Sequence, residues 1–257
     1  MSRIVIKVGT STLAHAGGRL NIRHVENLVK VLSDLKNAGH EIILVSSGAI
    51  GMGAGKLGLS ERPADMPGKQ AAAAVGQCEL MYVYDKLFSE YNHTVAQILL
   101  TGDDLEREDR RINFENTLFR LLEYGAIPIL NENDTMATAE ISLGDNDTLG
   151  ALTAVYAKAD LLILLSDIDG LLTADPHTDP DASVIPVVEE IDDSIIALAQ
   201  GSHGKQGTGG MITKINAAKI AAGHGIDMII SNGAAPQRLY ELMEGKPVGT
   251  RFIGRKL

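Results

Sequence analysis

The sequence predicts an α/β protein with a mainly parallel central sheet between two layers of helices, a three-layer αβα sandwich. Short, almost continuous apolar runs recur along the chain, which is typical of strands buried on both faces of a sheet. Longer stretches with apolar residues at helical spacing separate most of these runs. Because right-handed β-α-β crossovers place consecutive strands in parallel, this alternation predicts helices on both faces of one sheet.

The predicted strands are rich in Val, Ile and Leu. They begin at Ile4, Glu41, Thr94, Ala126, Leu161 and Asp227 (IVIKV, EIILVS, TVAQILL, AIPIL, LLILLS and DMIIS). The clearest helix covers residues 23–39, where apolar side chains recur every three or four positions and Gly39 supplies a stop. A second helix is expected from about Thr148 to Lys158, with Asp145 as a candidate N-cap.

No low-complexity linker or repeat divides the chain, so residues 1–257 are expected to form a single domain. The segment 171–191 is rich in Pro and Asp, which predicts a hairpin or excursion and not a domain boundary. The stretch GTRFIG from Gly249 is expected to contain the last strand of this domain.

Composition narrows the function. With 257 residues, of which 45% are hydrophobic and 22% charged, the chain can bury a substantial core. A formal net charge of −10 and a pI near 5.1 argue against a nucleic-acid partner, because phosphate binding uses clustered Lys and Arg. Small-molecule partners are favoured.

The single cysteine, Cys78, excludes a disulfide framework and fits a reducing cytosol. It lies in the apolar run AAAAVGQCELMYVY, so we expect it to be buried. The apolar runs are too short to span a bilayer, and the N-terminus lacks the pattern of a signal peptide, so a cytoplasmic location and no membrane partner are predicted. The histidines show no ligand spacing, and no metal site is assigned to the chain.

Functional residues are expected where strands end, because ligands of open parallel sheets bind beyond the carboxyl ends of the strands. Lys7 interrupts the first predicted strand, where burial on both faces is expected. Burying an unpaired ammonium group is costly, so a carboxylate or a phosphate is predicted beside it. An edge-strand lysine or a purely structural ion pair is the alternative.

The loop SSGAIGMGAGKLG follows the second strand. It is not a Walker phosphate loop, because Ile50 and Leu57 stand where that motif needs Gly and Ser or Thr. GAGKLG from Gly53 matches G-x-G-x-x-G, but it lies too far past its strand for a dinucleotide fold. Two interpretations remain open: backbone amides beside Ser46 and Ser47 bind an anion, or the glycines only let the chain bend.

The loop GSHGKQGTGGMITK leads into another predicted helix. Thr208, Gly209 and Gly210 are expected at its N-terminus, where free amides and the positive end of the helix dipole suit nucleotide phosphates. Lys214 would lie in the first turns and could add a mobile cation. Taken alone, it could equally be a solvated surface lysine.

An acidic stretch begins at Asn131 and contains no Lys or Arg between its carboxylates, Glu132, Asp134, Glu140, Asp145 and Asp147. DNDTLG from Asp145 resembles the start of an EF-hand. Leu149 stands where a third oxygen ligand is needed, however, and Tyr156 occupies the position of the bidentate Glu, so calcium is excluded. An N-cap role would explain one carboxylate but not the whole set.

Six motifs, in this order and spacing, resemble the amino acid kinase superfamily, and within it most closely the branch that phosphorylates free glutamate. They are KVGTST, SSGAIGMG, NENDT, GDNDTL, SDIDGL and GTGGMITK, and together they span essentially the whole chain. Acetylglutamate kinase, aspartokinase and uridylate kinase often have Gly-Gly where this chain has Gly9-Thr10.

The resemblance implies site residues by matching motif positions. The implied catalytic residues are Lys7, Lys214 and Asp147, with Asp147 orienting the two lysines. The implied glutamate-binding residues are Ser47, Asp134 and Asn146. The implied ATP-binding residues are Lys7, Ser166, Asp167, Thr208, Gly209, Gly210, Met211, Ile212, Thr213 and Lys214. The family often has Thr where this chain has Ser166, which keeps the hydroxyl group.

The implied reaction is phosphoryl transfer from ATP to the γ-carboxylate of L-glutamate, which gives γ-glutamyl phosphate, the first step of proline biosynthesis. A carboxylate is already ionised at neutral pH, so no strong general base is needed. Catalysis should rest on positioning and on neutralising charge at the phosphoryl group. Mg²⁺ is expected to be carried mostly by ATP, and the substrate ammonium and the two lysines would balance the acidic stretch.

Several expectations stay open. A sister kinase acting on acetylglutamate, aspartate or a nucleoside monophosphate is the nearest alternative, and a non-catalytic metabolite sensor of the same fold is another. Many bacterial members of this branch continue into a small PUA domain, which we do not expect here. The resemblance also implies a homo-oligomer and proline as a feedback inhibitor, and the expected lack of a PUA domain leaves both in question.

Overall fold

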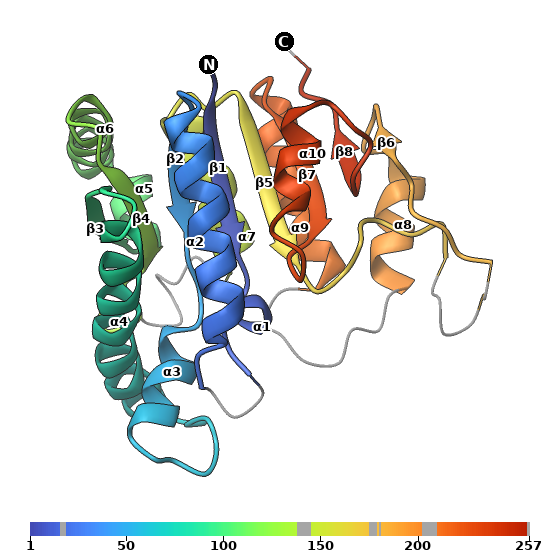
Figure 1. Ribbon diagram of the computed structural model, residues 1–257. Helices are drawn as coiled ribbons and strands as arrows, with labels where there is room; N and C mark the ends of the chain where they lie inside the picture. The colour runs from blue at the N-terminus through green and yellow to red at the C-terminus, as the bar shows by residue number, and fades with distance from the viewer. Residues whose placement is uncertain (16–18, 138–144, 175–178, 180, 202–209, 256–257) are drawn as a thin grey trace.

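The computed structural model describes residues 1–15, 19–137, 145–174, 179, 181–201 and 210–255. Its centre is an eight-stranded sheet in the order β3-β4-β2-β1-β5-β7-β8-β6 (Figure 1). The strands are β1 Arg3–Val8, β2 Glu41–Val45, β3 Val95–Leu100, β4 Ile127–Glu132, β5 Leu161–Ser166, β6 Val187–Val188, β7 Asp227–Asn232 and β8 Thr250–Phe252. Among the paired strands of the described residues, β7 and β8 alone are antiparallel, so the predicted mainly parallel sheet is confirmed, as are all the predicted strands.

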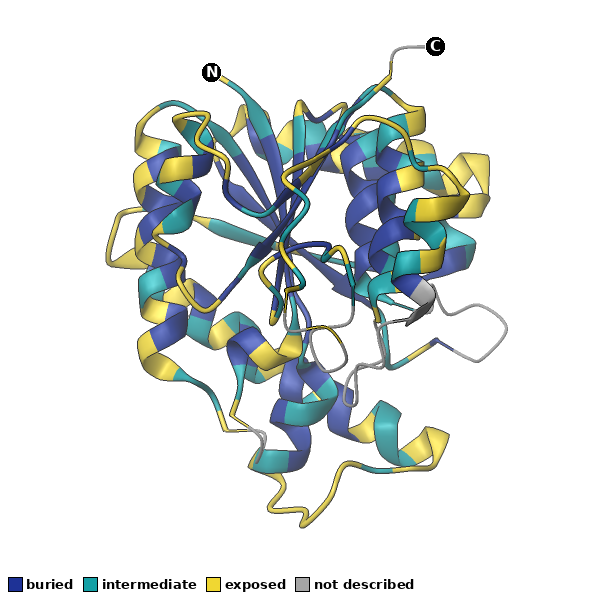
Figure 2. Ribbon diagram, turned by 90° about the vertical axis from the view of Figure 1, so that its right-hand side faces the viewer, coloured by how far each residue is buried: buried dark blue, intermediate teal, exposed yellow. Residues whose placement is uncertain are grey.

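Helices cover both faces of this sheet. They are α1 Thr10–Leu13, α2 Ile22–Asn37, α3 Ala49–Lys56, α4 Met66–Ser89, α5 Gly102–Glu106, α6 Glu108–Glu123, α7 Asn146–Tyr156, α8 Asp193–Gly201, α9 Met211–Gly223 and α10 Arg238–Met243. One apolar cluster joins α2, α4 and α10 to one face of the sheet, and another joins α6, α7 and α9 to the other face. Figure 2 shows the buried residues concentrated in the sheet and on the inward sides of the helices.

Local sequence signals explain the helix ends. The side chain of Asn21 accepts a hydrogen bond from the His24 amide and caps α2, which closes before Gly39, whose φ is 95°. Asp145 accepts a bond of 2.8 Å from the Thr148 amide, so its predicted N-cap role is confirmed. Helix α7 begins at Asn146, two residues earlier than predicted, and the cap therefore brings Asp147 into the first helical turn.

Helices α3 and α4 approach each other very closely. A Cβ atom at Gly53 would lie 1.7 Å from the carbonyl oxygen of Ala72, and one at Gly76 would lie 1.8 Å from that of Ala49. Gly53 therefore serves close helix packing, a role that neither interpretation of the loop SSGAIGMGAGKLG predicted. Gly48, in the same loop, has a φ of 96°, which favours glycine.

The predicted excursion between β5 and α8 begins as a hairpin, with Leu172 paired antiparallel to Val184. The expectation that Cys78 is buried is wrong, because its side chain is exposed on α4. The preceding residue, Gln77, is buried in its place. Among the described residues, no helix is both long and apolar enough to cross a membrane.

Candidate active site

The central strands point the same way, so their carboxyl ends share one edge of the sheet, the lower edge in Figure 1. Lys7 lies at the end of β1, Ser46 and Ser47 follow β2, and Asn131 lies at the end of β4. The first turn of α7 lies against this same edge, since Asn146 hydrogen-bonds Ser47 and Asp147 pairs with Lys7. The structure therefore gathers residues from distant motifs at the place where open parallel sheets bind ligands.

Three of the predicted residues form a buried charged cluster, which we call the Lys-Asp-Lys cluster: Lys7, Asp147 and Lys214. The Lys7 Nζ lies 2.6 Å from Asp147 Oδ1, and the Lys214 Nζ lies 3.0 Å from Asp147 Oδ2. The residues are 8%, 1% and 5% exposed. One carboxylate thus contacts two ammonium groups, so the cluster carries an excess of positive charge inside the protein.

Asp147 stays ionised in this setting. Burial opposes its ionisation, but the neighbouring Lys7 and Lys214 outweigh burial and hold the pKa of its carboxyl group below the ordinary value. Thr213 in the first turn of α9 also lies within hydrogen-bonding distance, with its Oγ1 2.9 Å from Asp147 Oδ2. The carboxylate is therefore a fixed anion that holds both lysines at the sheet edge.

A second, neutral group of side chains lies beside this cluster and is built around Asn146. Its Nδ2 lies 2.7 Å from the carbonyl oxygen of Ser46, 2.8 Å from Ser47 Oγ and 2.9 Å from Asn131 Oδ1. The structure thus brings together two of the three predicted glutamate-binding residues, Ser47 and Asn146. Since Asn146 immediately precedes Asp147, the two groups share the N-terminus of α7.

Asp134, the third predicted substrate residue, lies just past β4 and is partly buried. Burial and the nearby charge of Glu132 raise the pKa of the Asp134 carboxyl group to about 6, while Arg62 acts in the opposite direction. No described hydrogen bond or ion pair joins it to Ser47 or Asn146. Arg62, from the loop between α3 and α4, is a charge that the sequence analysis overlooked, so the substrate ammonium and the lysines are not the only neutralising groups.

The predicted ATP-binding residues come from two segments. Ser166 ends β5 and donates a 3.0 Å hydrogen bond to the exposed Asp167, and no described bond links this pair to the Lys-Asp-Lys cluster. Gly210 precedes α9, followed by Met211 and Ile212 in its first turn. Thr208 and Gly209 lie outside the described residues, as does Glu140 of the acidic stretch.

Two polar residues of α4, Gln77 and Tyr84, reach the site but were missed by sequence analysis. The Gln77 Oε1 accepts a 2.8 Å bond from Asn131 Nδ2, and the Tyr84 hydroxyl lies 3.0 Å from Ser46 Oγ. Burial raises the pKa of Tyr84 to about 12, so this hydroxyl is neutral. A polar side chain within the apolar run AAAAVGQCELMYVY was the available signal for Gln77.

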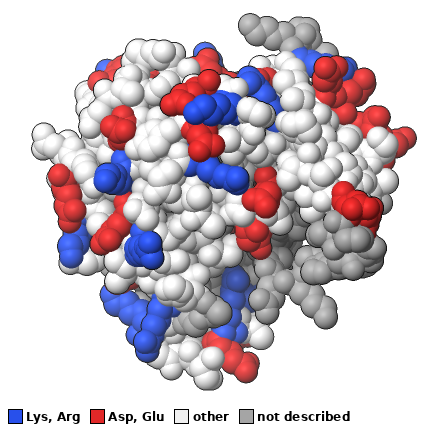
Figure 3. Space-filling view, turned by 45° about the vertical axis from the view of Figure 1, so that its right-hand side comes forward, with Lys and Arg blue, Asp and Glu red and all other residues white. Residues whose placement is uncertain are grey.

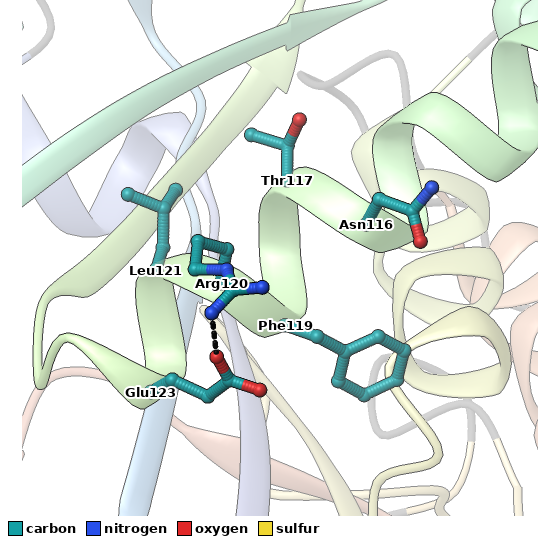
Figure 4. Close-up of a pocket in the computed structure, with 6 residues that line it drawn as sticks. All are labelled: Asn116, Thr117, Phe119, Arg120, Leu121 and Glu123. Atoms are coloured by element: carbon teal, nitrogen blue, oxygen red, sulfur yellow. Dashed lines mark ion pairs between the residues drawn. The ribbon is translucent and has the colours of Figure 1, made fainter.

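Other surface features are separate from this edge. The pocket in Figure 4 is lined by residues of α6 alone, and an ion pair of 2.8 Å joins two of them, Arg120 and Glu123. None of its lining residues was predicted for the site. On the face in Figure 3, acidic and basic side chains are interspersed and no large basic patch is seen. Within the described ranges, no three His, Cys, Asp or Glu side chains are grouped to hold a metal ion.

Comparison with solved structures identifies the fold class. The carbamate kinase of Giardia lamblia bound to AMP-PNP aligns with a TM-score of 0.69 and 16% identity over 99% of both chains. The UMP kinase of Bacillus anthracis aligns with a TM-score of 0.67 and 15% identity, over 99% of this chain and 97% of that one. At such low identity, these similarities show the fold alone.

The model of the amino acid kinase family matches residues 2–232, and the chain belongs to this family. Its relatives include the glutamate 5-kinase of Clostridium tetani, 54% identical over 98% of this chain and 94% of that protein. The glutamate 5-kinase of Clostridium perfringens is 50% identical over 99% of this chain and 96% of that protein. That of Caldanaerobacter subterraneus subsp. tengcongensis is 51% identical over 99% of this chain but 68% of its own length.

Proposed function

We propose that this chain is a kinase that transfers the γ-phosphoryl group of ATP to the γ-carboxylate of L-glutamate. The observation that carries the proposal is the Lys-Asp-Lys cluster, with its two buried ammonium groups, beside Ser47 and Asn146 at one sheet edge. Relatives named glutamate 5-kinase, about half identical over nearly the whole chain, support glutamate as the acceptor. The product is γ-glutamyl phosphate, an intermediate of proline biosynthesis.

The lysines supply the electrostatic part of catalysis. In phosphoryl transfer, negative charge is spread over the oxygens of the moving group, and fixed cations stabilise that charge without reorganising. Asp147 holds Lys7 and Lys214 in place but cannot cancel both of their charges. Both ammonium groups are thus held where the phosphates are proposed to bind, while the ionised γ-carboxylate of glutamate needs no general base.

The acceptor half of the site fits an amino acid. Asp134 is the carboxylate proposed to pair with the substrate ammonium, and Asn146 and Ser47 offer polar atoms beside it. An ammonium group favours the ionised form of Asp134, so glutamate binding would lower the pKa of this carboxyl group from its free value of about 6.

ATP would use the first turn of α9, the segment of Ser166 and Asp167, and the two lysines. Mg²⁺ is proposed to arrive with the nucleotide, whose phosphates offer the oxygen ligands that the ion prefers. When bound, the ion would neutralise charge on the β- and γ-phosphates. Lys7 and Lys214 would act on the transferring group from the protein side.

The proposal extends to the whole chain. We take residues 1–257 as one kinase domain, supported by the single sheet that runs from β1 to β8. A cytoplasmic location follows from the biosynthetic role. A homo-oligomeric state and feedback inhibition by proline rest on the family resemblance alone.

The test is ADP release with MgATP, run in parallel on L-glutamate, N-acetyl-L-glutamate, L-aspartate and UMP, with hydroxylamine to trap acyl phosphate. Turnover and a hydroxamate with free glutamate alone are the expected results. Turnover with another acceptor would place the chain among the sister kinases. Absence of turnover with all four would favour a metabolite sensor.

A further inference from the structure

The chain of side-chain amides from α4 to α7 goes beyond the residues assigned so far. Gln77 accepts from Asn131, and Asn131 accepts from Asn146, over 2.8 and 2.9 Å. Gln77 and Asn131 are 9% and 2% exposed, so water has little access to either amide. A buried amide chain of this kind has a defined direction, because every member must present an oxygen to its neighbour's nitrogen.

Backbone groups set that direction without ambiguity. The Glu132 amide can only donate, and it lies 2.9 Å from Asn131 Oδ1, which fixes the oxygen of Asn131 on that side. The nitrogen of Asn131 must then face Gln77. The carbonyl oxygen of Ser46 can only accept, which fixes the nitrogen of Asn146 toward the strand ends.

The consequence concerns the other end of the Asn146 amide. With Nδ2 turned toward Ser46, Ser47 and Asn131, the Asn146 Oδ1 points away from them, and no described residue donates to it. A carbonyl oxygen in this position is a suitable acceptor for an ammonium group. The backbone contacts decide which way each amide faces, and the hydrogen bonds from Asn146 to Asn131 and from Asn131 to Gln77 hold the amides in place.

We propose that Gln77 is a positioning residue for the acceptor substrate: it holds Asn131, and through it holds Asn146 Oδ1 toward the substrate ammonium. This inference rests on the proposed glutamate kinase function. Helix α4 is well placed for the task, because Tyr84, two turns after Gln77 on the same helix face, contacts the neighbouring strand end through Ser46. One helix thus contacts residues at the carboxyl ends of two different strands.

The test is steady-state kinetics on Gln77→Met, which keeps the shape of the side chain but removes the accepting oxygen. The KM for glutamate should rise about tenfold, equivalent to about 1.4 kcal/mol, whereas the KM for ATP should stay within about twofold. Gln237→Met, the same substitution at an exposed site, is the matched control and should change neither constant.

A double-mutant cycle separates positioning from general structural damage. If Gln77 acts through Asn131, Gln77→Met should have no further effect on the KM for glutamate once Asn131→Ala is present. If Gln77→Met fails to fold, Gln77→Asn carries the same prediction, because it is polar but one methylene too short to reach Asn131. An unchanged KM for glutamate, equal rises for both substrates, or additive effects in the cycle would each overturn the inference.

The wild-type measurement keeps the two proposals apart. If the wild-type protein does not turn over glutamate, the proposed function fails. If it does, and the substitution at position 77 leaves the KM for glutamate unchanged, only the role of Gln77 fails.

Discussion

Asp147 is the residue on which two buried ammonium groups depend. Because its side chain is 1% exposed and contacts both lysines, removing its charge would take away an ion pair from each of two buried ammonium groups. Removing one partner of a buried ion pair typically costs several kcal/mol, because the remaining charge is still desolvated. The cluster proposed to act on the phosphates therefore also makes the fold depend on one carboxylate.

Asp147→Asn should lower the free energy of unfolding by about 3–5 kcal/mol at pH 7 and reduce kcat at least about 100-fold. The lowered pKa of Asp147 means that its stabilising contribution is present at neutral pH and is lost as the pH falls below the ordinary Asp range. The difference in free energy of unfolding between wild type and variant, measured by urea unfolding, should be smaller at low pH than at pH 7. Asp145→Asn, which keeps an N-cap residue, is the control and should change stability by less than about 0.5 kcal/mol.

Asp134 should show the opposite pH dependence. Its raised pKa, about 6, means that protonation favours the folded state, so stabilisation from this group is lost as the pH rises through 6. Asp134→Asn should therefore raise the free energy of unfolding by about 1–2 kcal/mol at pH 8 and have almost no effect at pH 4. As a control, Asp181→Asn at an exposed position should change the free energy of unfolding by less than about 0.5 kcal/mol at both pH values. An equal effect of Asp134→Asn at pH 4 and pH 8 would contradict the raised pKa of Asp134.

At the scale of elements, the contact between α3 and α4 connects packing to the site. Gly53 and Gly76 let the two helix backbones touch, and α4 then presents Gln77 and Tyr84 to the strand ends. Gly53 of the second loop thus supports the positions of Asn131 and Ser46 indirectly, through the placement of α4.

Gly53→Ala should destabilise the protein by at least about 2–3 kcal/mol, because the added methyl group would overlap the Ala72 carbonyl oxygen and force the helices apart. Gly51→Ala lies on the same helix, and its nearest neighbour would be a Thr10 methyl group at 3.9 Å. It should be neutral or stabilise by up to about 1 kcal/mol through helix propensity. Thermal unfolding of both variants measures the difference. An equal loss of stability in the two would show that the contact between Gly53 and Ala72 is not the cause.

At the scale of the whole molecule, the sequence predicts the sheet well, because buried parallel strands appear as almost continuous apolar runs. It also predicts that Lys7 needs an anion, since a charge inside such a run cannot stay unpaired. Spacing alone could not identify Asp147 as that anion, because the contact is made across the fold; the family resemblance linked the two residues.

Other parts of the site were out of reach for a similar reason. Consecutive residues of a helix point about 100° apart, so Gln77 faces inward on α4 while Cys78 faces outward. An apolar run alone does not predict which of the two is buried. Arg62 approaches Asp134 from a loop between two helices, where no periodic pattern indicates direction. Thr208 and Gly209 stay predictions.

The proposed function divides the sheet edge into a phosphate half around Lys7, Asp147 and Lys214 and an acceptor half around Ser47, Asp134 and Asn146. The kinetics of Lys7→Ala and Asp134→Ala, measured together with varied glutamate and varied ATP, test this division most directly. Lys7→Ala should mainly lower kcat, and Asp134→Ala should mainly raise the KM for glutamate. Equal effects of both substitutions on both constants would contradict the division of the site.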